Sequence, residues 1–302
     1  MNTKKIFFFE FTVGTGIVSE ELLFEGKLMF DTLLNQFLNE NYVVKTILCE
    51  KIVNKYPEYK NIKNLEVITS KNYLEDFKNA LDDSDMALVI APEEELHLYN
   101  LTKIIEEKGV LNLGCHLEGV KIAGDKYLTY EAIKNVVNTP KTYFPKKYVV
   151  KHRLGCDSTH STFDENYIVQ EFINGEPYSM IFIVNNSKFY PVCMNKQYIE
   201  ERYCGGEINI CHPLKEKAII ECEKTLKQIS GLNGYVGVDF MIDFEEISIL
   251  EINPRITTSI CGIKSNPSIG KLLIDNLRVN SLKITLEHTV KFKRKNNGFE
   301  FF

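Results

Sequence analysis

Short apolar runs alternate with stretches of helical periodicity through the first third of the chain. Apolar side chains recur at helical spacing over 22–38, and a second helix is predicted over 96–108, ending at Gly109. Strands are predicted at 5–11, 43–48, 65–68 and 86–91. Strands that alternate with helices predict a parallel sheet covered by helices, extending to about residue 115.

The pattern changes to α+β texture beyond residue 115. A helix predicted over 125–137 ends before Thr139-Pro140, because the residue before a proline avoids the helical region. Further helices are predicted over 213–232 and 269–277. Strands are predicted at 148–151, 167–173, 178–184, 189–199, 235–242 and 247–252. The lysine-rich segment 291–295 is interpreted as a solvated end.

These patterns divide the chain into three expected parts. Residues 1–115 form an N-terminal α/β domain, 116–185 a central lid subdomain, and 186–302 a C-terminal subdomain that carries a metal site. The fold class is an α/β domain followed by an α+β core.

The two strands at 235–242 and 247–252 carry the most informative side chains. If they form a hairpin centred on Glu245, Asp239 faces Glu251, with Cβ atoms about 5 Å apart. Asn253 lies two residues beyond Glu251 and therefore points to the same face. Close carboxylates repel each other unless a cation or proton intervenes. Hard oxygen ligands suit Mg²⁺ or Mn²⁺, so we expect a metal site here rather than a solvated hairpin.

Charged side chains suited to phosphates lie at three other places. Arg255 follows Pro254 after the second strand and is a candidate bidentate clamp. Lys126 opens a predicted helix, and Lys151 ends an apolar strand before the small-residue loop 155–159. A strand-end lysine beside a flexible loop suits phosphate binding. Taken singly, each lysine is more often a surface residue.

A polar pair interrupts the apolar strand at Gln170-Glu171-Phe172-Ile173, and Asn174-Gly175-Glu176 then breaks it. Such a connection between strands exposes backbone groups that an adenine edge can pair with. The alternative is a surface strand followed by a turn.

Composition limits the classes of function. The chain has 302 residues, of which 44% are hydrophobic and 25% charged, so a large core is expected and disorder is excluded. The net charge of −5 disfavours nucleic acid as a partner, because neutralising phosphates needs clustered Lys and Arg. No apolar run approaches the roughly 18 residues of a membrane span, and the run near Met1 is too short for a signal peptide.

The eight cysteines form no C-x-x-C pair, so zinc-ribbon and thioredoxin-like sites lack support. Their places in apolar segments favour buried free thiols in a reducing cytoplasm. A dinucleotide-binding loop at Gly14-x-Gly16 is disfavoured, because Ser19 replaces the third glycine of that motif.

Taken in their order along the chain, from Lys126 to Arg255, these residues resemble the ATP-grasp superfamily of carboxylate–amine ligases. The resemblance implies two subdomains that grip ATP, with Lys126 and Lys151 on its α- and β-phosphates. It implies that Glu171, Phe172 and Ile173 line the adenine site, and that Gln170 belongs to the same hinge. Asp239, Glu251 and Asn253 would hold the metal, while Arg255 and Lys151 would act on the transferring phosphoryl group.

Two departures from the superfamily pattern concern the nucleotide. The acid that binds the ribose in many relatives would fall at Pro177, with Glu176 one residue early. The lid loop carries Cys156-Asp157-Ser158 where some relatives are richer in glycine.

A narrower likeness is carried by Glu10-Phe11, Gly14-Thr15-Gly16, Glu25-Gly26 and Gly114-Cys115 together with the I-A-G-D-K-Y run. These pieces resemble the tyramine–glutamate ligases of methanofuran biosynthesis. That likeness implies a small-molecule acid and amine as substrates, joined through an acyl phosphate. It suggests 14–16 and 204–212 as substrate-facing segments. A small-molecule kinase and a nucleotide-binding regulator stay as alternatives, and a homo-oligomer is left open.

Overall fold

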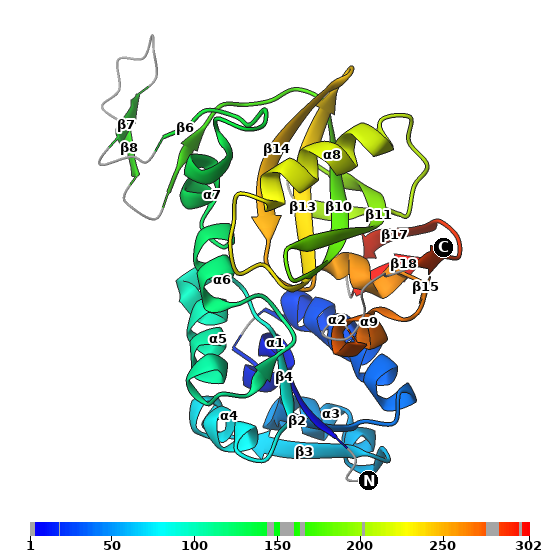
Figure 1. The fold of residues 1–302 in the computed structure, drawn as a ribbon. Coiled ribbons are helices and arrows are strands. Elements are labelled where there is room, and N and C mark those ends of the chain that lie inside the picture. Colours follow the sequence, from blue (N-terminus) through cyan, green and yellow to red (C-terminus); the bar gives the residue numbers. More distant parts are fainter. Residues whose placement is uncertain are drawn as a thin grey trace.

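The N-terminal part is a parallel sheet in the order β3-β2-β1-β4-β5. The structure is a computed structural model that describes residues 4–17, 19–143, 148–151, 160–163, 167–200, 203–275, 284–295 and 298–302. The strands are β1 (Lys5–Glu10), β2 (Val43–Cys49), β3 (Leu65–Ser70), β4 (Met86–Ile90) and β5 (Leu111–Asn112). The predicted parallel sheet is confirmed, and it occupies the lower half of Figure 1.

Helices cover both faces of this sheet. The long helix α2 follows the first strand, and α5 ends just before Gly109, whose φ of 69° is the left-handed value that glycine tolerates at a helix end. The helices are α1 (Phe11–Thr15), α2 (Glu20–Asn39), α3 (Glu50–Lys55), η1 (Pro57–Asn61), α4 (Tyr73–Leu81), η2 (Glu94–Leu96) and α5 (His97–Glu107).

A helical and hairpin region connects the two main sheets. Helix α6 (Leu117–Ala123) leads to α7 (Lys126–Ile133), which Asp125 caps by accepting hydrogen bonds from the backbone N–H groups of Tyr127 and Leu128. Helix α7 ends four residues before the predicted 137, where the β-branched pair Val136-Val137 disfavours helix.

Two small two-stranded sheets follow that helix. Strand β6 (Thr142–Tyr143) pairs with β9 (Val169–Gln170), so the strand predicted at 167–173 is much shorter than expected. Strand β7 (Tyr148–Lys151) pairs with β8 (His160–Phe163) and stands to one side of the main body in Figure 1.

The C-terminal part is an antiparallel sheet in the order β14-β13-β10-β11-β12-β17-β18. Helix α8 (Lys215–Leu226) covers one face, and η3 (Thr258–Gly262) and α9 (Ile269–Asp275) lie at the other. The strands are β10 (Glu176–Asn185), β11 (Lys188–Ile199), β12 (Tyr203–Ile208), β13 (Gly234–Asp243), β14 (Glu246–Asn253), β17 (Val290–Lys295) and β18 (Gly298–Phe301). Strands β15 (Ser265–Asn266) and β16 (Thr285–Leu286) form a separate pair.

The structure corrects the interpretation of segment 291–295 as a solvated end. This segment is the strand β17, which pairs with β12 on one side and β18 on the other. Its lysines face outward, whereas Phe292 is only 1% exposed. The alternation of Lys291, Phe292 and Lys293 is the period-two signal that the lysine content hid.

Strand β10 lies inside the C-terminal sheet, between β11 and β13. A boundary between residues 185 and 186 would separate β10 from its hairpin partner β11. We therefore propose that the C-terminal subdomain begins at β10 and that the central segment ends near residue 175.

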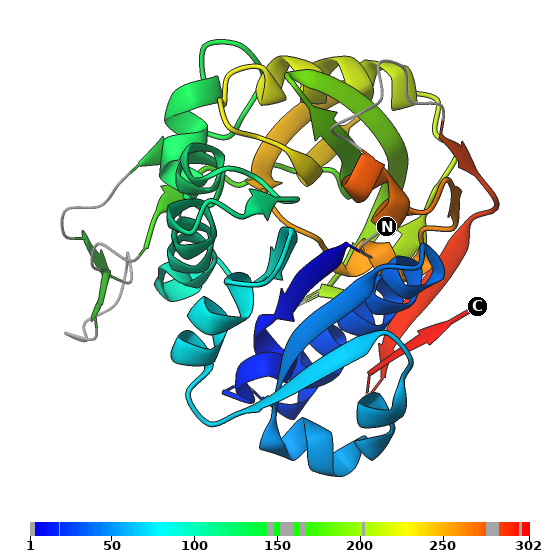
Figure 2. The same cartoon turned by 60° about the horizontal axis from the view of Figure 1, so that its bottom comes forward.

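The hydrophobic core does not follow the domain division. One buried cluster contains Phe7 and Phe9 of the parallel sheet together with Val238 and Phe240 of β13. The other joins Phe30 and Phe37 of α2 to Ile181, Ile260 and Phe292. Figure 2 shows α2 beside β17 and β18, and helix α2 also contacts η3 and α9. The two sheets are therefore held together by shared apolar packing.

Among the described residues, no helix combines the length and the apolar character that crossing a membrane requires.

Candidate active site

The β13–β14 hairpin places the predicted metal-binding side chains on one face. Asp239 pairs with Glu251, as predicted, but the predicted turn centre is wrong, because Asp243 pairs with Glu246 across a turn at Phe244-Glu245. A β-bulge reconciles the two observations. Phe240 pairs with Ile249, so Leu250 is the extra residue between the two registers.

The bulge determines which side chains of the hairpin face the core and which face the cavity. Ile247, Ile249 and Ile252 all belong to the buried cluster under α8, although strict alternation from Ile249 would turn Ile252 away. The extra residue leaves Glu251 and Asn253 on the opposite face, beside Asp239.

These three side chains line a cavity of about 360 Å³, which we call the metal-side cavity after the metal site predicted there. The Asn253 amide Nδ2 lies 3.3 Å from Asp239 Oδ2 and donates to it. Burial and the nearby Glu251 carboxylate raise the pKa of Asp239 to about 7, although hydrogen bonds from Gln197 and Asn253 and the charge of Arg255 oppose this. Two carboxylates this close need a compensating cation.

Lys126 supplies part of that compensation. Its Nζ atom lies 2.8 Å from Glu251 Oε2. Burial would lower the pKa of Lys126, but the Glu251 carboxylate outweighs it and the pKa is raised. The start of helix α7 and the strand that carries Glu251 therefore meet.

Arg255 is clamped to the N-terminal part. Its Nε and Nη2 atoms donate to the two carboxylate oxygens of Glu93 over 2.9 and 3.0 Å, and Nη1 donates to the Ile256 carbonyl. The guanidinium also lines the metal-side cavity. Sequence reasoning missed Glu93, although the acidic run 93–95 directly after strand β4 was a signal at the carboxyl end of a parallel strand.

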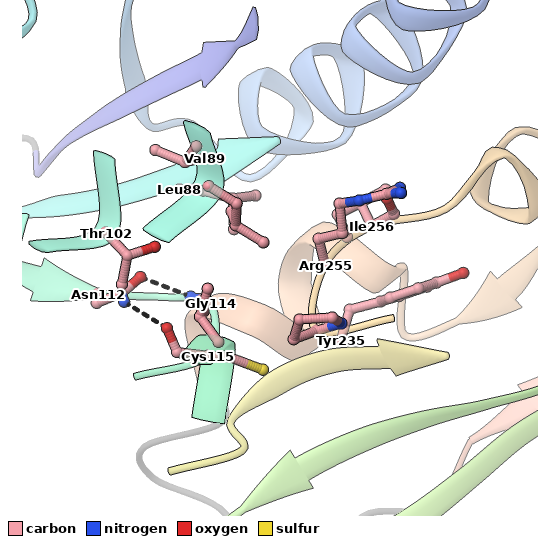
Figure 3. Close-up of a pocket in the computed structure, with 12 residues that line it drawn as sticks. Leu88, Val89, Thr102, Asn112, Gly114, Cys115, Tyr235, Arg255 and Ile256 are labelled. Carbon is pink, nitrogen blue, oxygen red and sulfur yellow. Dashed lines mark hydrogen bonds between the residues drawn. The ribbon is translucent and has the colours of Figure 1, made fainter. Parts of the chain in front are cut away.

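Near Arg255 a small cavity lies where the two domains meet, and Figure 3 shows the hydrogen bonds that Asn112 makes in its wall. Asn112 accepts from the Gly114 N–H and donates to the Cys115 carbonyl, both over 2.9 Å. The Asn233 side chain donates to Gly114 O over 3.1 Å. The cavity has a volume of about 10 Å³, enough for roughly one water molecule at most. It is therefore too small to be a substrate or nucleotide site.

The predicted adenine hinge runs from β9 to β10. Gln170 Nε2 donates to Thr142 Oγ1 over 3.0 Å, and the Glu171 N–H donates to the Lys141 carbonyl over 2.9 Å. Phe172 is 85% exposed, whereas Ile173 is half-buried. A Cβ on Gly175 would lie 2.4 Å from the Ile242 carbonyl oxygen, so glycine lets the hinge pass close to β13.

Glu176 and Lys151 are the two remaining predicted site residues. Glu176 pairs with Lys196 Nζ at 2.5 Å, so its carboxylate already has a partner. Lys151 ends β7, but its side chain and the loop 152–159, with Cys156-Asp157-Ser158, lie outside the described residues.

In both segments that were predicted to face the substrates, residues beside the segment line a cavity, rather than the segment itself. Within 203–212 only Tyr203 lines the metal-side cavity, and most of this segment is strand β12. Gly14 packs against Phe9, where a Cβ would lie 2.2 Å from the ring. Thr12 and Ile17, on either side of 14–16, line a second cavity instead. The described cysteines are free thiols, mostly buried, but Cys211 is exposed.

Within the described residues, no group of three or more His, Cys, Asp or Glu side chains is arranged as a complete metal cage. Two carboxylates and an amide oxygen form an incomplete set of hard donors. Such a set fits Mg²⁺, which keeps positions for water and substrate phosphates. The donor chemistry therefore fits a metal that is completed by its substrate.

The chain thus combines a parallel α/β domain with an antiparallel sheet, where carboxylates and Arg255 line one cavity and Lys126 pairs with Glu251. Residues 123–259 match the ATP-grasp domain family, and residues 50–120 match the pre ATP-grasp 3 domain. The chain belongs to the ATP-grasp superfamily, as its sequence motifs suggested.

Two relatives share much of its length. The chain is 48% identical over 285 residues to tyramine–L-glutamate ligase of Methanocaldococcus jannaschii, covering 93% of this chain and 92% of that protein. It is also 48% identical to the enzyme of the same name from Methanocaldococcus fervens, covering 93% and 97%. A crystal structure of an ATP-grasp superfamily protein from Archaeoglobus fulgidus has a TM-score of 0.77 at 26% identity, covering 99% of both chains.

Proposed function

We propose that this protein is an ATP-dependent ligase that joins tyramine to the γ-carboxylate of L-glutamate. The observation that carries the proposal is the cavity where Asp239, Glu251 and Asn253 meet, beside Lys126 and Arg255. The 48% identity to two tyramine–L-glutamate ligases supports the choice of substrates.

The reaction has two steps. A glutamate carboxylate oxygen attacks the γ-phosphorus of ATP, and the bond to the β,γ-bridging oxygen breaks, giving a glutamyl phosphate and ADP. The tyramine nitrogen then attacks the acyl carbon. The C–O bond to phosphate breaks, phosphate leaves, and the nitrogen loses one proton to phosphate or solvent and keeps one N–H in the amide.

The side chains of this chain position the reactants and oppose their charge. Lys126 would exchange Glu251 for phosphate oxygens when the nucleotide binds. Arg255 would stabilise the transferring phosphoryl group from the position where Glu93 holds it. Phe172 and Ile173 would cover the adenine, and Gln170 and Glu171 would hold the hinge against β6. Lys151 would reach the phosphates from the β7–β8 hairpin.

Asp239, Glu251 and Asn253 would hold Mg²⁺ or Mn²⁺, which when bound neutralises phosphate charge and leaves the γ-phosphorus open to attack. The residues fit this role because the two carboxylates lie on one face of the hairpin and line one cavity, with Lys126 and Arg255 as nearby positive charges. A reducing cytoplasm is the compartment that suits the free thiols.

Incubation with ATP, Mg²⁺, L-glutamate and tyramine tests the proposal. We expect ADP, phosphate and γ-glutamyltyramine in equal amounts. ADP release with glutamate and another amine, but no product with tyramine, would retain the ligase and exclude these substrates. With hydroxylamine as the amine, a hydroxamate would distinguish an acyl phosphate from the stable phosphate ester of a kinase.

A further inference from the structure

A second cavity, of about 480 Å³, lies at the carboxyl end of the parallel sheet. It opens between β1 and β4, where Glu10 pairs with Ile90 and both line the wall. The chain passes outward to β2 and β3 on one side and to β5 on the other, so this is the point where the strand order reverses. Open α/β sheets bind ligands at such switch points, and the volume lies in the range of roughly 300–1,000 Å³ for small-molecule sites.

The walls combine apolar side chains with carboxylates. Phe11, Leu22 and Tyr73 supply aromatic and aliphatic surface. Glu10, Glu25, Glu94 and Glu95 supply acidic groups, against the single guanidinium of Arg255 at one edge. A cavity of this composition favours a cation attached to an apolar body and disfavours a dicarboxylate.

Glu10 is the acidic group set deepest in the wall. Its side chain ends β1 and is 2% exposed as a residue. Its Oε2 atom accepts hydrogen bonds from Thr12 Oγ1 at 2.8 Å and from the Val13 N–H at 2.9 Å. Oε1 lies instead toward Gly26, where a Cβ would approach it to 2.6 Å. The missing side chain at Gly26 leaves room beside that oxygen, and a carboxylate in the wall of a cavity attracts a cation.

The second cavity meets the metal-side cavity at two residues. Glu25 and Arg255 line both. Thr258 and Arg294 fix the Glu25 carboxylate, and Glu93 fixes the Arg255 guanidinium. The two cavities therefore adjoin at this pair of oppositely charged side chains.

We propose that this cavity is the subsite for the amine substrate, with the ammonium between Glu10 and Glu25 and the aromatic ring among Phe11, Leu22 and Tyr73. This assignment rests on the proposed ligase function and adds which cavity takes the amine. The reacting nitrogen then lies at the end nearest Arg255, and the glutamyl group is kept on the metal side by the carboxylates of the amine cavity.

Equilibrium dialysis of tyramine at pH 8 tests the subsite without requiring turnover. Leu22 is 50% exposed, so Leu22→Lys adds a positive charge to the wall without disturbing the core. Like charges should weaken tyramine binding at least about tenfold. The matched control is Ile220→Lys, on helix α8 at 53% exposure and outside both cavities, which should bind as the wild type does. Equal binding by the Leu22→Lys and wild-type proteins would overturn the assignment.

A ligand of opposite charge tests the recognition itself. 3-(4-Hydroxyphenyl)propionate has the shape of tyramine but carries a carboxylate in place of the ammonium. We expect the wild type not to bind it, and we expect Glu10→Gln, which keeps the oxygen that caps α1, to lose about tenfold in tyramine affinity. Binding of the acid as tightly as the amine would contradict the proposal.

Turnover with hydroxylamine separates the subsite from the proposed function. Hydroxylamine needs no aromatic wall, so in Leu22→Lys the KM for tyramine should rise at least about tenfold more than the KM for hydroxylamine. If both reactions fall together, the cavity does not select the amine. If wild type binds tyramine in dialysis but makes no amide with glutamate, the proposed function fails and the subsite stands.

Discussion

Arg255 donates two hydrogen bonds to the carboxylate of Glu93, which lies 162 residues earlier in the chain. The pair links the loop after β14 to the end of β4, and so ties the β13–β14 hairpin to the parallel sheet. The Arg255 guanidinium is thus oriented by the other domain, and its position depends on how the domains are packed.

We expect Glu93→Gln to lower the melting temperature by several degrees, because losing one partner of a half-buried pair costs about 1–3 kcal/mol. ATP turnover should fall as well, since Arg255 loses its orientation. Thermal unfolding and ADP release measure the two effects. Glu300→Gln removes a carboxylate from an exposed pair with Lys295 and should change neither. An unchanged melting temperature in Glu93→Gln would show that the pair does not hold the domains.

Asp239→Asn and Glu251→Ala should each abolish turnover without unfolding the chain. Changes outside the direct ligands of a metal typically cost 10–100-fold, so loss of a ligand should cost at least about 100-fold. ADP release and thermal unfolding check both parts. Because burial and Glu251 raise the pKa of Asp239, the asparagine variant should be at least as stable as wild type above pH 7. Activity retained by both variants would contradict the metal assignment.

Phe172→Ala should raise the KM for ATP several-fold, because stacking of an aromatic ring on a base contributes about 1–3 kcal/mol. Steady-state kinetics at saturating glutamate and tyramine measure the change. Phe244 at the β13–β14 turn is 96% exposed and provides the control, since Phe244→Ala should leave this KM unchanged. Equal KM values for ATP in the two variants would remove Phe172 from the adenine site.

Glu10 should make stability depend on pH. Burial raises the pKa of its carboxyl from 4.5 to about 7 in the folded protein. The folded chain therefore holds the proton more tightly than the unfolded chain, and this contribution to stability is lost as the pH rises through 7. Glu10→Gln removes the loss, so its melting temperature relative to wild type should rise by several degrees from pH 5 to pH 8. A difference in melting temperature between Glu10→Gln and wild type that stays constant from pH 5 to pH 8 would contradict this prediction.

Gly26→Ala should destabilise the chain by about 1–3 kcal/mol through overpacking. Its Cβ would lie 2.0 Å from Thr12 Oγ1 and 2.6 Å from Glu10 Oε1. Chemical denaturation measures the effect. At Gly114 the nearest atoms lie 3.4 and 3.7 Å from a Cβ, so Gly114→Ala should cost much less. Equal stabilities for the two variants would show that α2 moves away from β1 without penalty.

Local sequence patterns predicted most of the fold. The alternation of apolar runs and helical spacing predicted the parallel sheet, and the facing of Asp239 and Glu251 followed from the spacing of two strands. Strand β12 was not predicted, because its Cys204-Gly205-Gly206 stretch has the composition of a loop. A Cβ on Gly205 would lie 2.3 Å from the Phe292 carbonyl, and only the neighbouring strand reveals that requirement.

Local sequence patterns could not predict the contacts between the two domains. Glu93 meets Arg255, and Glu25 meets Arg294, only because α2 and β4 pack beside the C-terminal sheet. No periodicity in the sequence relates positions so far apart. The second cavity was missed for the same reason, since its walls come from β1, α2, β4 and the loop after β14.

The extra residue at Leu250 decides which way the end of its strand faces. Leu250 and Glu251 together oppose Asp239, so Ile249 faces the apolar layer under α8, Glu251 faces the cavity and Ile252 faces the apolar layer again. Regular pairing of the same residues, with no bulge, would turn Glu251 toward the apolar layer and Ile252 toward the cavity. An irregularity of one residue in the backbone, and not the residue types alone, therefore brings both carboxylates to the same place.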